Sequence, residues 1–168
     1  MEHSDVLLTI TEVSVAFAGF SGIVAVFGRR DPGRWPLGDR YRFFSLVETS
    51  LVAAFLSLVP FGCAAVGLSP EVVWRLASIL AVVYMAASYV IHISQYRSLP
   101  TAARSGAAWA DVYAMAIVDV VIVGLNLYNL TVLSEAGPFL LSLILLVGES
   151  GFYFARLLFQ AFNTQPDV

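Results

Sequence analysis

The sequence contains no lysine and has little charge of either sign. Only 12% of its 168 residues are charged and 59% are hydrophobic, whereas ordinary globular domains carry about 25% charged residues. A soluble domain of this size must cover most of its surface with polar groups, and this chain has too few of them. The composition therefore excludes a water-soluble globule and a disordered chain, and it predicts an integral membrane protein.

Cysteine and histidine are also scarce. Cys63 is the single cysteine, and the two histidines, His3 and His92, lie far apart. The chain therefore has neither a disulfide framework nor the spacing of a metal site. It also lacks a phosphate-binding glycine loop and a serine–histidine–aspartate set. We expect no enzyme, no metal and no cofactor. The formal net charge of −3 gives no reason to expect nucleic-acid binding.

Long apolar segments predict an all-α fold. About 20 mostly apolar residues are needed to cross a bilayer as a helix. Breaks that contain proline or glycine separate the segments, and two of these breaks are short enough to join antiparallel neighbours. We predict a single domain, residues 1–168, that forms a polytopic bundle of five transmembrane helices at about 6–28, 42–67, 71–96, 111–133 and 138–162.

The arginines indicate how the bundle is oriented. Cytoplasmic loops carry an excess of basic residues, and the second and fourth connections of this chain carry none. The first and third connections carry Arg29, Arg30, Arg34, Arg40, Arg42, Arg97 and Arg104. We therefore expect a multi-pass protein of the plasma membrane, in this case the bacterial inner membrane, with its N-terminus outside and its C-terminus in the cytoplasm. Membrane lipid is an expected partner.

Ionisable residues within the predicted spans are the candidates for function, because each is costly in hydrocarbon and needs a partner, water or a proton. Acids outnumber fixed cations among them. The acids are Glu12, Glu48, Asp119 and Glu149, and the cations are Arg75 and Arg156. At least one acid is therefore expected to be protonated, in contact with water or close to a bound cation.

Helical periodicity places several of these residues on common faces. Asp119, Asn126 and Asn129 fall within an arc of about 80° at 100° per residue. Glu149 lies nearest the bilayer centre, between two glycines, and Glu48 and Glu12 add acids at other depths. Acidic and amide groups at outer, middle and inner levels suggest a pathway for a cation or a proton.

The same residues also have a structural interpretation. Polar stripes in membrane bundles commonly form hydrogen-bonded networks between helices, at about 0.6–2 kcal/mol per contact. Arg75 with Glu12, and Arg156 with Glu48 or Asp119, are candidate ion pairs. The two asparagines are equally compatible with helix packing and with a pathway lining.

Three functions remain open. We favour an ion-conducting homo-oligomer, a cation or proton channel lined by the acidic and amide side chains, because subunits around an axis can build a pore from one repeated helix. The first alternative is a non-conducting structural or accessory subunit. The second is a small proton-coupled transporter, although the sequence shows no pocket for a particular substrate.

Overall fold

The computed structural model describes residues 3–27, 37–98 and 108–163, and every regular element within them is helical. The helices are α1 (Ser4–Phe27), α2 (Leu37–Ala65), α3 (Pro70–Ser98), α4 (Ala108–Tyr128) with a π-helical end η3 (Asn129–Leu133), and α5 (Ala136–Asn163). Five of them contain stretches long and apolar enough to cross a membrane, with mean hydropathies of 1.6 to 1.9. The predicted all-α architecture with five spans is confirmed.

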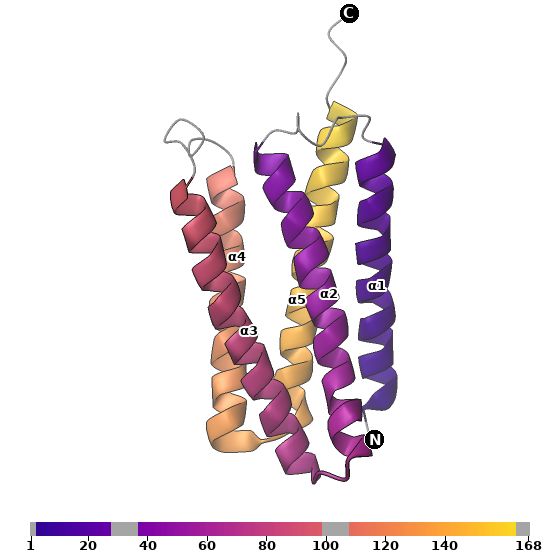
Figure 1. Ribbon diagram of the computed structural model, residues 1–168, viewed down its shortest axis with the longest axis vertical. Coiled ribbons are helices and arrows are strands. Elements are labelled where there is room, and N and C mark those ends of the chain that lie inside the picture. The colour runs from indigo at the N-terminus through magenta and orange to yellow at the C-terminus, as the bar shows by residue number, and fades with distance from the viewer. Residues whose placement is uncertain (1–2, 28–36, 99–107, 164–168) are drawn as a thin grey trace, which may run out of the picture.

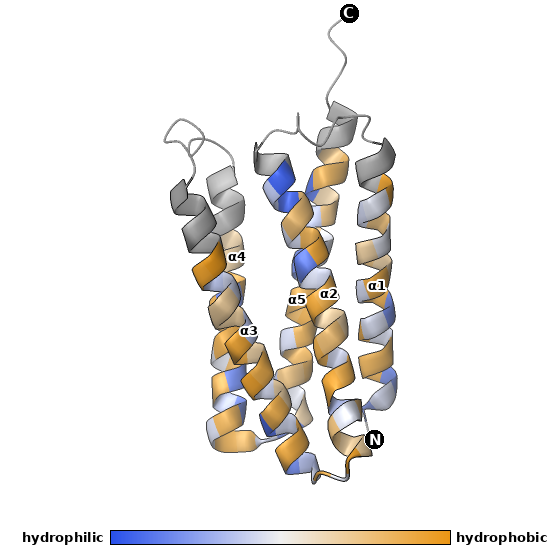
Figure 2. Cartoon of the chain, in the orientation of Figure 1, coloured by the Kyte–Doolittle hydropathy of each residue, from blue (hydrophilic) through white to orange (hydrophobic). Residues whose placement is uncertain are grey.

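The helices run side by side, with α2 and α5 in the middle of the bundle (Figure 1). Helix α1 packs along one side of this pair, and α3 and α4 lie on the other side. The spans in α2 and α5 are each 44% buried, whereas those in α1 and α4 are 22% and 17% buried. Hydrophobic residues predominate along the helices (Figure 2), and all five helices carry large hydrophobic side chains that are exposed. The central helices therefore provide most of the protein interior, and the outer helices provide most of the surface for lipid.

A glycine-terminated turn joins α2 to α3. Gly67 adopts the left-handed conformation with φ 81°, which glycine reaches without a side-chain clash. The Gly67 amide donates to the Ala64 carbonyl at 3.0 Å, and the Leu68 amide donates to the Cys63 carbonyl at 3.3 Å. This pair of bonds is a Schellman motif, which satisfies carbonyls at the end of α2. The α2–α3 and α4–α5 turns lie at the same end of the bundle as the start of α1 (Figure 1).

The turn between α4 and α5 contains a feature that periodicity did not predict. The last residues of the fourth span form a π-helix, and the Ser134 amide donates to the Asn129 carbonyl at 2.8 Å. Ser134 then adopts a left-handed conformation with φ 57°. The wider π-turn rotates the residues that follow Asn129 relative to a regular helix. As a result, the chain reverses directly into α5.

The structure also changes the interpretation of one arginine. We counted Arg42 among the loop residues that set the orientation, but it lies inside α2 and only 4% of it is exposed. Arg40 lies on the same helix, with its guanidinium carbon 5.6 Å from the centre of the Phe44 ring. The helix begins at Leu37, five residues before the predicted span, and its stretch long and apolar enough to cross a membrane begins at Arg40, so that stretch contains both arginines.

Candidate functional site

Glu149 is the most deeply buried acid of the described residues, with 7% of its surface exposed. It lies on α5, about 20 Å from the start of that helix at 1.5 Å per residue. Its Oε2 atom has no hydrogen-bond partner within the described part of the chain. Asp119 of α4 and Glu48 of α2 lie within electrostatic range of it, and the Tyr153 side chain lies one turn further along α5. Two acids from neighbouring helices therefore lie within electrostatic range of Glu149. We call Glu48, Asp119 and Glu149 the acid trio.

Glu48 connects α2 to α3. Its Oε1 atom accepts hydrogen bonds from the Tyr84 hydroxyl at 2.7 Å and from the Ser88 hydroxyl at 2.9 Å. Tyr84 and Ser88 are one turn apart, so they approach the carboxylate from the same face of α3. Hydrogen bonds of this kind favour the ionised form of a carboxyl group. The site therefore contains a carboxylate with two donors beside Glu149, whose Oε2 atom has none.

A pair of hydroxyls holds α2 against α5 next to Glu149. Thr49 Oγ1 lies 2.8 Å from Ser150 Oγ. Each hydroxyl has one hydrogen, and its other possible acceptor is a carbonyl of its own helix, Ser45 at 2.8 Å for Thr49 and Leu146 at 3.0 Å for Ser150. One of the two hydroxyls therefore donates to the other while its partner donates to a carbonyl. These bonds place residues 48 and 149 at the same depth on adjacent helices. They therefore explain why two acids distant in the sequence come close together.

A group of hydroxyl-bearing side chains continues from the acid trio toward the far end of α5. Tyr153 is 1% exposed, and its ring packs against Tyr41 with the centroids 6.3 Å apart. Tyr41, Ser45 and Tyr153 are hydrogen-bonding neighbours. Our sequence analysis did not select these residues. Tyr153 shares the helical face of Glu149 and Arg156, and this spacing was the signal that could have identified it.

The two asparagines of the fourth span point into the protein interior, and both are 0% exposed. Asn126 donates from Nδ2 to the Ser142 hydroxyl at 2.8 Å and to the Ile122 carbonyl at 2.9 Å. Asn129 donates from Nδ2 to the Ser78 hydroxyl at 2.9 Å. They connect α4 to α5 and η3 to α3, respectively. Both asparagines are thus held by contacts within the protomer, and their part in an ion pathway stays a prediction.

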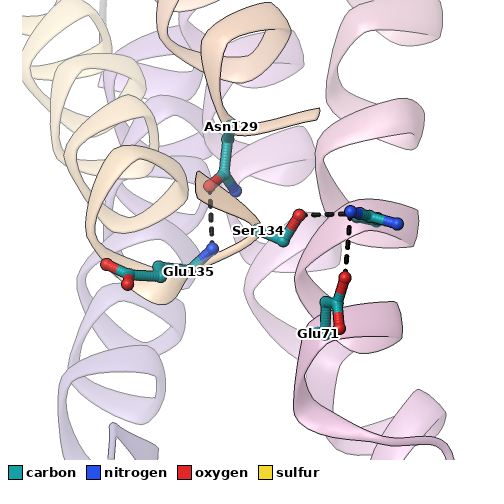
Figure 3. A network of polar contacts seen from close by, with 5 residues as sticks. Glu71, Asn129, Ser134 and Glu135 are labelled. Carbon is teal, nitrogen blue, oxygen red and sulfur yellow. Dashed lines mark hydrogen bonds and ion pairs between the residues drawn. The ribbon is translucent and has the colours of Figure 1, made fainter. Parts of the chain in front are cut away.

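A second set of contacts ties the α4–α5 turn to α3 (Figure 3). Asn129 Oδ1 accepts a hydrogen bond from the Glu135 amide at 2.9 Å. Arg75 donates from Nε to the Ser134 hydroxyl at 2.6 Å, and its Nη2 atom lies 2.9 Å from Glu71 Oε1. Arg75 is thus part of an ion pair within its own helix, and this pair is on the protein surface.

The structure separates Glu12 from Arg75. The rings of His3 and Trp74 are 6.2 Å apart, which aligns the first turn of α1 with Arg75. Glu12 lies nine residues beyond His3, or about 13 Å along the helix axis. Its side chain is exposed on the outer face of α1. Of the four acids that we selected, Glu12 is therefore the one placed away from the acid trio.

Arg156 lies on α5, three residues after Tyr153. Its guanidinium carbon is 5.9 Å from the centre of the Phe152 ring, a distance at which a cation and an aromatic face attract. Its expected pairing with Glu48 or Asp119 stays a prediction. The His92 side chain lies outside the residues that the structure describes in atomic detail.

An apolar groove of about 210 Å³ runs between α2 and α3, and its lining includes Phe55, Val83 and Tyr84. Phe55 and Val83 are 63% and 59% exposed, so the groove opens on the outer face of the bundle. The groove has no polar surface. It suits the acyl chains of lipid and lies beside the hydrogen bond between Tyr84 and Glu48.

The fold and this site define a multi-pass membrane protein with acids in its interior. Comparison with protein-family models, with curated proteins and with solved structures gives no match to the chain. The argument for function therefore depends on the geometry of the site.

Proposed function

We propose that the protein conducts protons across the membrane, and that Glu149 is the group that takes up and releases them. The observation that carries this proposal is the carboxyl oxygen Glu149 Oε2, which is buried and has no hydrogen-bond partner among the described residues. Such an arrangement is costly for a group that serves packing alone. A group that exchanges protons with water needs an open acceptor position.

The surroundings of Glu149 favour a proton over a directly coordinated metal ion. Like charges repel strongly at low dielectric, so a proton on Glu149 relieves its repulsion with Asp119 and Glu48. Among the residues that the structure describes, no three histidine, cysteine or acidic side chains are grouped closely enough to hold a metal ion. Hydroxyls of Tyr153 and Tyr84 adjoin the acids instead. Hydroxyls can both donate and accept, which is what a proton relay requires.

The proposed route lies within one protomer. Glu48, Asp119 and Glu149 come from α2, α4 and α5 of the same chain, and the charges of the first two act on Glu149. The residues Tyr41, Ser45 and Tyr153 would connect the acid trio to the end of the bundle where α5 finishes. We propose that this end is cytoplasmic, on the basis of the arginine distribution, and that the membrane is a bacterial plasma membrane. A homo-oligomer remains a prediction that this route does not need.

Proton flux in sealed liposomes tests this function. Purified protein is reconstituted with a trapped pH-sensitive dye, and a potassium gradient with valinomycin sets the membrane potential. We expect Glu149→Gln to reduce the flux at least tenfold, because glutamine keeps the size of the side chain but cannot take up a proton.

Glu12→Gln is the matched control. It makes the same chemical change within a span, but on the exposed face of α1. We expect it to leave the flux within twofold of the unmodified protein. Absence of flux from the unmodified protein at every gradient and voltage would refute the proposal. Equal flux from both glutamine variants and the unmodified protein would exclude Glu149 from the route.

The accessory-subunit function is supported by a different observation. The contacts of Asn129 with Ser78 and Glu135 join η3 to α3 and to the turn before α5, and they leave neither its amide nitrogen nor its oxygen without a partner. Residues of this kind stabilise a bundle without any role in conduction. If liposomes show no flux, this function becomes the better account of the polar interior.

A further inference from the structure

Asn126 and Asn129 form a natural comparison within one helix. Both are 0% exposed, and each donates from Nδ2 to a serine hydroxyl on a neighbouring helix. They differ at the side-chain oxygen. Asn129 Oδ1 accepts from the Glu135 amide, whereas Asn126 Oδ1 has no partner in the part of the chain that the structure describes.

The hydrogen bonds around Asn126 determine what a partner of its oxygen must be. Both hydrogens of Nδ2 are used, on Ser142 Oγ and on the Ile122 carbonyl. Ser142 in turn gives its own hydrogen to the Pro138 carbonyl at 2.9 Å. The site therefore offers acceptor positions only. An anion or another acceptor is excluded, and a hydrogen-bond donor such as water fits.

Asn126 lies about two helical turns from Asp119, a member of the acid trio on the same helix. Ser142, its partner on α5, lies seven residues before Glu149, which is about 10.5 Å along the helix. Asp119 lies seven residues before Asn126 on α4, so the same interval separates both pairs. Asn126 thus lies on the side of the acid trio that leads to the α4–α5 turn.

We propose that Asn126 Oδ1 binds a water molecule that delivers protons to Glu149 from the outer side. This inference rests on the proposed function, since it names the group that supplies the acid trio. A hydronium ion formed at this water gives up one proton by breaking one of its O–H bonds. The proton passes along transient water to Glu149 Oε2, where a new O–H bond forms, and neutral water remains at Asn126. Asn126 is a positioning residue and carries no proton itself.

Three variants separate positioning from packing. Asn126→Leu removes the open oxygen. Asn129→Leu removes an equally buried asparagine whose oxygen is already occupied. Ser142→Ala removes a partner of Asn126 but keeps Oδ1. We expect Asn126→Leu to reduce proton flux in liposomes at least tenfold, while the other two variants stay within twofold. Flux that survives in Asn126→Leu, or falls equally in all three variants, would overturn the proposal.

Radiolytic hydroxyl labelling gives a second readout that does not depend on flux. Labelling marks side chains next to bound water, and Leu143 adjoins Ser142 and is 0% exposed. We expect Leu143 to be labelled in the unmodified protein and in Asn129→Leu, and to lose at least three-quarters of its label in Asn126→Leu. Labelled Leu143 without any flux would support the water site and refute the proposed function. Unlabelled Leu143 in a conducting protein would refute the water site alone.

Discussion

The Tyr84 hydroxyl donates a hydrogen bond to Glu48 Oε1 across 2.7 Å, and this contact links α3 to α2 beside the acid trio. Removal of the hydroxyl in Tyr84→Phe leaves Ser88 as a donor to the same oxygen. Hydrogen bonds between membrane helices contribute about 0.6–1.7 kcal/mol. We expect Tyr84→Phe to lower the free energy of unfolding by that amount, as measured by denaturant titration in detergent.

A double-mutant cycle with Glu48→Gln attributes the loss to this pair. If the two residues interact directly, the double variant will lose less stability than the sum of the two single losses, by about 0.5 kcal/mol or more. Strict additivity would show that Tyr84 stabilises the bundle through its ring and not through Glu48.

Ser134 provides a test of backbone strain at the α4–α5 turn. It is the non-glycine residue with a positive φ among those described, and its hydroxyl accepts from Arg75. Ser134→Gly and Ser134→Ala both lose this hydrogen bond, but only glycine adopts the left-handed conformation without a clash. We expect the alanine variant to be less stable than the glycine variant by about 1–2 kcal/mol, as measured by thermal unfolding.

The two glycines that flank Glu149 on α5 are predicted to tolerate substitution differently. A Cβ atom at Gly151 would lie 3.5 Å from Phe17 Cζ, whereas one at Gly148 meets nothing within 4 Å. Phe17 in turn packs on Phe154, with ring centroids 5.7 Å apart. We expect Gly151→Leu to destabilise the protein by about 1–3 kcal/mol, which is typical of overpacking.

Gly148→Leu is the control for this substitution. Leucine has a higher helix propensity than glycine by up to about 1 kcal/mol, so the control is expected to be neutral or stabilising. Thermal unfolding of both variants measures the difference. Equal destabilisation would indicate a second contact at Gly148, for example with another subunit.

Membrane orientation is open to a direct chemical test. In a Cys63→Ser background, a cysteine is placed either at Ser69 in the α2–α3 turn or at Arg34 in the first connection. A membrane-impermeant thiol reagent applied to intact cells is expected to label the cysteine at position 69. It is expected to label the cysteine at position 34 only after the cells are permeabilised. The reverse pattern would contradict the arginine-based orientation.

The sequence alone was sufficient to identify the five spans and all three acids of the candidate site. A membrane helix must satisfy its own backbone hydrogen bonds and present apolar side chains to lipid, so its length and composition are visible in the sequence. The same reasoning identified Glu48, Asp119 and Glu149, because ionisable residues stand out in an apolar segment. The π-helical end of the fourth span was not visible, because hydropathy is insensitive to a local change from i→i+4 to i→i+5 bonding.

The tertiary structure alone decided which of the polar residues meet. Glu12 and Glu149 are both acids within apolar helices, yet one is exposed on α1 and the other is 7% exposed in the interior. Arg42 changed from a loop residue to a buried one in the same way. Helical periodicity gives the relative angles of residues on one helix, but it does not give the rotation of that helix against its neighbours. That rotation is determined by packing between helices, such as the Thr49–Ser150 contact, and these contacts join residues far apart in the chain.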